Sequence, residues 1–112
     1  MLVGNILTSP LDYWMEKKKS EKESTLHSEV SITNALGLHA RAAAKFVKVA
    51  SRYKAESFVD KDGETVSGRS VMGLMMLAAA PGSKIKISTQ GAEAKQALEA
   101  LKKLVEGKFD EE

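Results

Sequence analysis

The chain has 112 residues, which suits one ordinary domain, and its 43% hydrophobic and 29% charged residues are typical of a globular protein. It contains no cysteine, which excludes disulfides and thiol chemistry, and its two separated histidines do not form a metal-binding cluster. The net charge is only +2 and aromatic residues make up 5%, so we expect no nucleic-acid binding. No apolar run approaches the ~20 residues that span a bilayer, so we expect a cytoplasmic domain without membrane insertion.

The first 27 residues differ in composition from the rest of the chain. Residues 12–24 are rich in charge, with four lysines against four acidic residues, and such a segment buries little apolar surface. We therefore expect a flexible N-terminal extension over residues 1–27. Three interpretations stay open: a tail without function, a true start at Met15, and a segment that docks on a partner. The apolar residues of such a docking segment are Leu2, Val3, Ile6, Leu7, Tyr13 and Trp14.

From Ser28 onward the hydrophobic pattern is regular and predicts seven elements in the order βαββαβα. Apolar and polar residues alternate in four expected strands, over residues 28–33, 55–60, 64–67 and 84–88. Apolar residues recur at helical spacing in three expected helices, over residues 40–50, 71–77 and 94–105. Each strand has one polar face, so we expect an α+β fold in which a single sheet carries all helices on its other face.

Local signals mark the ends of several of these elements. Asp62-Gly63 predicts a hairpin turn between the second and third strands. Ser70 is the expected N-cap of the second helix, and Gly107 is expected to close the third. Phe58 is expected on the open face of the sheet, where one aromatic side chain decides nothing about function.

The residues that carry chemistry surround His39, which stands at the predicted start of a helix with Arg41 two residues later. The free N–H groups and positive dipole end of a helix N-terminus favour an incoming anion and a neutral imidazole, so His39 is placed to accept a phosphoryl group. Arg41 adds a forked cation for the same oxygens, and Gly37 permits a close approach of the loop. Alternatively, His39 is only a polar cap and Arg41 a surface charge, because His-x-Arg is not specific by itself.

Two motifs resemble a known family. The run Gly37-Leu38-His39-Ala40-Arg41-Ala42-Ala43 is similar to the Gly-Leu-His-Ala-Arg-Pro-Ala signature of HPr, the histidine phosphocarrier of the bacterial phosphoenolpyruvate-dependent phosphotransferase system, and of its NPr paralogue. Ser70, 31 residues after His39, begins an apolar, methionine-rich run that is similar to the second family signature. The resemblance covers residues 28–112, where we expect a phosphocarrier domain, and does not cover residues 1–27.

The resemblance implies an HPr-like open-faced sandwich, with a four-stranded antiparallel sheet and three helices on one face. It implies that His39 accepts a phosphoryl group on Nδ1 from phosphoenolpyruvate-charged enzyme I and passes it to an EIIA-type acceptor, in sugar uptake or its regulation. Arg41 and the backbone N–H groups of Ala40 and Arg41 would hold the phosphoryl group. The protein would be a monomeric carrier with a phosphohistidine intermediate, not an enzyme, and would need no metal or cofactor.

Ser70 matches the regulatory serine that an HPr serine kinase/phosphorylase modifies in many Gram-positive relatives. A serine before a helix is also a cap worth about 1 kcal/mol, so capping alone explains its presence. Phosphate there would suit the helix dipole and would place negative charge inside a docking surface. Both interpretations of Ser70 stay open.

The expected partner surface is an apolar patch of Val71, Met72 and Met75 beside His39, with Ala44 and Lys48 at its edge. Methionine suits surfaces that fit several partners in turn, and a rim cation steers acidic partners. The alternative is that these residues belong to the core, where we place two other members of the helix. These are Leu74 and Leu77.

One position departs from the family pattern, because Ala42 stands where proline is usual. Alanine restores a backbone N–H in the first helical turn and relaxes the backbone there.

An alternative function is that of an NPr-like or Ser70-controlled regulatory protein that acts on metabolic or nitrogen signalling. An RNA-binding domain is disfavoured, because the strands lack stacking aromatics and the chain lacks a basic stripe.

Overall fold

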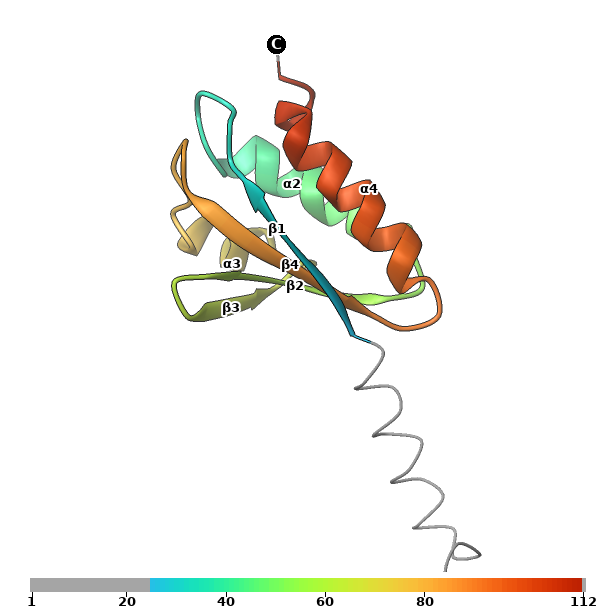
Figure 1. The fold of residues 1–112 in the computed structure, drawn as a ribbon. Helices are drawn as coiled ribbons and strands as arrows, with labels where there is room; N and C mark the ends of the chain where they lie inside the picture. The colour runs from blue at the N-terminus through green and yellow to red at the C-terminus, as the bar shows by residue number, and fades with distance from the viewer. Residues whose placement is uncertain (1–24, 112) are drawn as a thin grey trace, which may run out of the picture.

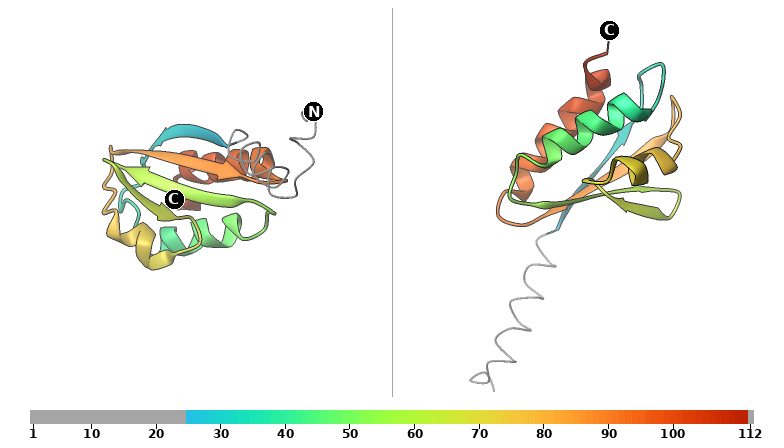
Figure 2. Two further views of the ribbon diagram at one scale, coloured as in Figure 1. Left: turned by 90° about the horizontal axis from the view of Figure 1, so that it is seen from below. Right: turned by 180° about the vertical axis from the view of Figure 1, so that it is seen from behind.

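Four strands form one antiparallel sheet in the computed structural model, which describes residues 25–111 (Figure 1). The strands are β1 (Leu26–Ser31), β2 (Glu56–Lys61), β3 (Glu64–Ser67) and β4 (Lys84–Gln90), in the order β1-β4-β2-β3. The helices are α2 (Ala40–Ala50), α3 (Val71–Met76) and α4 (Ala94–Glu106), followed by a short turn, η2 (Lys108–Asp110). The helices cover one face of the sheet (Figure 2), which confirms the expected α+β class and element order.

The first strand begins earlier than expected. β1 starts at Leu26 and not at Ser28, because it pairs with β4 along its whole length. Leu26 lies opposite Thr89 and His27 opposite Ser88, so His27 belongs to the sheet. The interpretations offered for the N-terminal extension, including its apolar residues and Met15, concern residues outside the described range.

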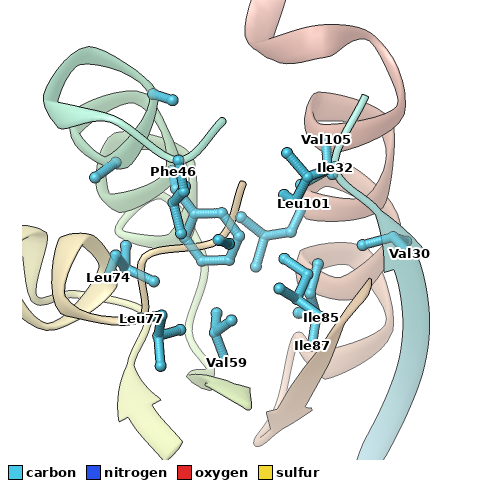
Figure 3. Close-up of a cluster of buried hydrophobic side chains, with 14 of the residues drawn as sticks. Val30, Ile32, Phe46, Val59, Leu74, Leu77, Ile85, Ile87, Leu101 and Val105 are labelled. Atoms are coloured by element: carbon cyan, nitrogen blue, oxygen red, sulfur yellow. The ribbon is translucent and has the colours of Figure 1, made fainter. Parts of the chain in front are cut away.

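The core lies between the helices and the covered face of the sheet. Phe46 of α2 is fully buried there, and Figure 3 shows its ring between Leu74 of α3 and Leu101 of α4. Leu74 and Leu77 are both buried, as expected from their spacing. The strands contribute the inward members of their alternating patterns, which are Val30, Val59, Ile85 and Ile87.

Phe109 joins this core from beyond the last helix and was not expected in it. It is 0% exposed, although it follows the helical stripe that the spacing predicts for α4. Burial of a phenylalanine side chain contributes roughly 1.5–3 kcal/mol, so the residues after α4 are held firmly against the domain.

Two tight backbone turns have the glycines that they need. Asp62 and Gly63 have φ angles of 53° and 87°, the two positive values of the hairpin turn expected there. Gly37 has a φ of 67°, and a Cβ atom at this position would lie 2.5 Å from the carbonyl oxygen of Ala79. Leu38 N–H donates to the same oxygen at 2.9 Å. The loop before α2 is therefore joined directly to the segment after α3.

We predict that Gly37→Ala destabilises the fold by about 3 kcal/mol, because the new methyl group adds a steric clash to the backbone strain. Gly63→Ala is the matched control, since its φ is also positive and no atom lies within 4 Å of its new Cβ. The control should lose only about 1 kcal/mol of backbone strain. Urea denaturation of both variants checks this, and equal losses would contradict the importance of the close approach.

Candidate functional site

His39 is the N-cap residue of α2, with φ −83° and ψ −178°. The helix begins at Ala40 as expected, and the N–H of Ala43 donates to the carbonyl oxygen of His39 at 2.8 Å. The backbone N–H groups of Ala40, Arg41 and Ala42 precede this first helical hydrogen bond, so the helix itself offers them no acceptor. The His39 side chain makes no cap hydrogen bond. His39 is therefore followed directly in the chain by free N–H donors at a helix N-terminus, a position that suits an anion.

Glu111 provides a partner for the His39 ring that no sequence motif indicated. Nε2 of His39 forms a short hydrogen bond with Oε2 of Glu111, across 72 residues of sequence. The other carboxylate oxygen accepts a hydrogen bond from Nδ2 of Asn34 at 3.1 Å. Asn34 is 1% exposed and also donates to the carbonyl oxygen of Gly37 at 2.8 Å. Both oxygens of Glu111 are thus held by groups of the loop before α2.

A left-handed turn after α4 brings Glu111 to this place. Lys108, Phe109 and Asp110 have φ angles of 59°, 55° and 60°, whereas Gly107, the C-cap residue of α4, has a φ of −86°. The expected end of the helix at Gly107 is correct, but the left-handed residues come after the glycine. The buried Phe109 ring anchors the turn, and Lys45 of α2 donates from Nζ to the Phe109 carbonyl oxygen at 2.7 Å.

The charge state of Glu111 follows from its neighbours. The hydrogen bond with His39 holds the pKa of the Glu111 carboxyl below its usual range, and partial desolvation opposes this effect. The Asn34 hydrogen bond and the positive charge of Lys45 also lower this pKa. At neutral pH the group is therefore an ionised carboxylate, which accepts hydrogen bonds and donates none.

An open depression lies beside the His39 ring. It contains two cations, Arg41 and Lys45, and two acidic residues of the turn after α4. Arg41 is exposed. Within residues 25–111 no three acidic or histidine side chains gather in a way that could hold a metal ion. The residues that line the depression are Leu36, His39, Ala40, Arg41, Lys45, Asp110 and Glu111.

Helix α3 carries the second candidate site. Ser70 is its N-cap residue, and Oγ accepts a hydrogen bond from the N–H of Gly73 at 2.9 Å, which confirms the expected cap. Met72, Met75 and Met76 are 73%, 43% and 75% exposed. We call these three residues the methionine patch.

The methionine patch differs from the expected surface in two members. Val71 is partly buried and packs against the core, so it contributes only at the edge of the patch. Met76, which the spacing did not assign, is exposed, because the short helix ends at this residue. α3 packs against α2, on which Ala44 and Lys48 are exposed. The hydrogen bond between Leu38 and Ala79 joins the loop before α2 to the segment after α3.

Comparisons with known proteins agree on one family. The family model described as "PTS HPr component phosphorylation site" matches residues 26–107. The phosphocarrier protein HPr of Neisseria meningitidis serogroup B is 49% identical over 86 residues, which are 77% of this chain and 97% of that protein. The crystal structure of HPr from Bacillus anthracis has a TM-score of 0.71 at 45% identity, covering 73% of this chain and 98% of that one. An HPr dimer from Thermoanaerobacter tengcongensis has a TM-score of 0.62 at 41% identity, covering 73% and 94%.

None of the helices within residues 25–111 has both the length and the apolar character needed to cross a membrane.

The lowered pKa of Glu111 predicts how the docking of residues 108–111 depends on pH. The pKa of this carboxyl is lower in the folded state than in the unfolded state, where it is about 4.3. The carboxylate therefore stabilises the docked turn in full above the unfolded-state pKa, and this stabilisation is lost as the pH falls through the folded-state pKa. Protonation of Glu111 removes the negative charge that strengthens its hydrogen bonds with His39 and Asn34, and this causes the loss.

NMR spectra of the Phe109 backbone amide and of the Asn34 side-chain amide, which donates to Oε1 of Glu111, check this prediction when recorded from pH 7 to pH 3. Both sets of signals should move together in the acid range, and Glu111→Gln should abolish the shared transition. Signals of the two residues that titrate independently would contradict the coupling.

Proposed function

The chain belongs to the HPr family of phosphocarrier proteins of the phosphotransferase system, and on this basis we propose that it carries a phosphoryl group on Nδ1 of His39. The group would come from enzyme I charged by phosphoenolpyruvate and pass to an EIIA-type acceptor. One observation carries the proposal: Glu111 engages Nε2 of His39 at the N-terminus of α2, so Nδ1 is the ring nitrogen left for chemistry.

The transfer needs a nucleophile and a site for negative charge. The lone pair of Nδ1 attacks phosphorus, a P–N bond forms, and the bond between phosphorus and the donor breaks with its electron pair returning to the donor. The backbone N–H groups of Ala40 and Arg41 and the helix dipole favour the phosphoryl oxygens. The guanidinium of Arg41 offsets further charge, as expected for phosphoryl transfer by positioning and electrostatics. The reverse sequence delivers the group to the acceptor.

We assign partner docking to the methionine patch and its surroundings. Flexible thioether side chains adapt to different surfaces, which suits a carrier that meets a donor and an acceptor in turn. Lys48, exposed on the neighbouring helix, adds a cation at the rim for acidic partners. Ser70 lies directly before the patch, so phosphorylation of its hydroxyl by a serine kinase would place negative charge at the docking surface. We propose that the carrier acts in the cytoplasm as a monomer.

Phosphotransfer from phosphoenolpyruvate tests the carrier function. The chain, incubated with phosphoenolpyruvate, magnesium and enzyme I from the same organism, should gain one phosphoryl group that is labile in acid and stable in base. His39→Ala should gain none, because it removes the accepting nitrogen. Intact-mass spectrometry measures both.

A known HPr that is charged in parallel controls for active enzyme I. If it gains label and this chain does not, the proposed function is wrong. Supplying the charged protein with a sugar-permease EIIA and with a regulatory EIIA then separates sugar uptake from the NPr-like regulatory alternative, according to which acceptor takes the group faster.

The docking role of the methionine patch predicts a specific kinetic effect. Met72→Ser should raise the KM of enzyme I for the carrier by about tenfold and leave kcat unchanged, because it removes apolar contact area and touches no reacting atom. Leu26→Ser is a matched control, since Leu26 is also an exposed apolar residue but lies on β1, the edge strand opposite β3. A Met72→Ser variant with the KM of the control would contradict the assignment.

A further inference from the structure

We propose that Glu111 is a positioning residue for His39: its carboxylate accepts the Nε2 proton, fixes the orientation of the ring, and so selects the tautomer of the neutral ring in which Nδ1 holds the lone pair. This inference rests on the proposed function, because it concerns the same ring. Glu111 lies beyond residues 26–107, the segment that the family model matches. Only the folded arrangement of the turn after α4 connects it with His39.

The position of the proton follows from the chemistry of the two partners. An ionised carboxylate has no proton to give, so the hydrogen in the contact between Nε2 and Oε2 belongs to Nε2. A neutral imidazole carries a single N–H, and Nδ1 therefore holds the free lone pair. Nδ1 is also the ring nitrogen closer to the backbone of the cap residue, as the side-chain oxygen is in an Asn or Asp cap.

The contacts around Glu111 fix it in place from several elements. Nδ2 of Asn34 holds Oε1 at 3.1 Å, which leaves Oε2 for the ring. Lys45 of α2 holds the backbone of the turn through the Phe109 carbonyl oxygen at 2.7 Å. The other charged groups that line this depression are Arg41 of α2 and Asp110 of the turn itself. A carboxylate held at both oxygens orients the ring more strictly than a mobile side chain would.

The same contact predicts which nitrogen becomes phosphorylated. A phosphoryl group on Nδ1 leaves the Nε2–H to Glu111 hydrogen bond intact, so the charged carrier keeps this partner. A phosphoryl group on Nε2 would require the bond to break and would bring its negative charge against the carboxylate. Glu111 should therefore disfavour Nε2 both sterically and electrostatically.

The test compares the wild type with Glu111→Gln, which keeps the size of the side chain and removes its charge. Glu106→Gln is the matched control, because Glu106 is exposed on α4 and lines a different depression, with Glu29 and Lys84. NMR of the protein labelled with 15N in histidine reads the proton on each ring nitrogen at neutral pH. Initial rates of phosphorylation by charged enzyme I are measured at saturating carrier.

In the wild type and in Glu106→Gln we expect a downfield, slowly exchanging proton on Nε2 of His39. In Glu111→Gln this proton should move upfield and exchange faster. The rate at saturation should fall about tenfold, equivalent to one charge-assisted hydrogen bond, while KM stays unchanged. A merely structural contact would change stability without changing kcat.

Three results would overturn the inference: a proton on Nδ1 in the neutral wild-type ring, a Glu111→Gln spectrum that matches the wild type, or an unchanged rate at saturation. Failure of the proposed function looks different. In that case the wild type takes no label from charged enzyme I at all, while the NMR spectra still decide which nitrogen holds the proton.

Discussion

The close approach of Gly37 to the Ala79 carbonyl oxygen joins the two parts of the molecule to which we assign function. On one side of this junction the chain continues directly into His39 and α2, and on the other it comes from α3 with the methionine patch. A side chain at residue 37 would push these segments apart. The segments that carry His39 and the methionine patch are therefore joined by backbone atoms, and under the proposed function a partner bound on α3 would find His39 in a fixed position.

The site itself is closed by residues that are distant in sequence. The loop before α2 supplies Asn34 and His39, and the turn after α4 supplies Phe109 and Glu111. Phe109 provides the anchoring through burial, while Glu111 provides the polar contact at the end of the same turn. This division explains how a short turn can orient the His39 ring. The buried Phe109 side chain fixes the turn against the core, and the Glu111 carboxylate then only has to accept its hydrogen bonds.

Sequence reasoning predicted the elements whose signals are local. Alternation identified the four strands, the Asp62-Gly63 pair identified the hairpin, and Ser70 was recognised as a cap. It missed Phe109 and Glu111, because no rule assigns a left-handed turn to Lys108, Phe109 and Asp110, none of which is glycine. The misplaced start of β1 has a similar cause, since the pairing with β4 extends the strand over residues whose own pattern is weak.

The 72-residue separation of Glu111 from His39 also has a consequence in time. Ribosomes add about 5–20 residues per second, so His39 exists for roughly 4–14 s before Glu111 has been made. During synthesis the imidazole is present, yet β4, α4 and the carboxylate that meets its ring are not. His39 therefore acquires its hydrogen-bond partner only when the last helix docks. Until then the imidazole lacks the contact that orients it in the folded protein.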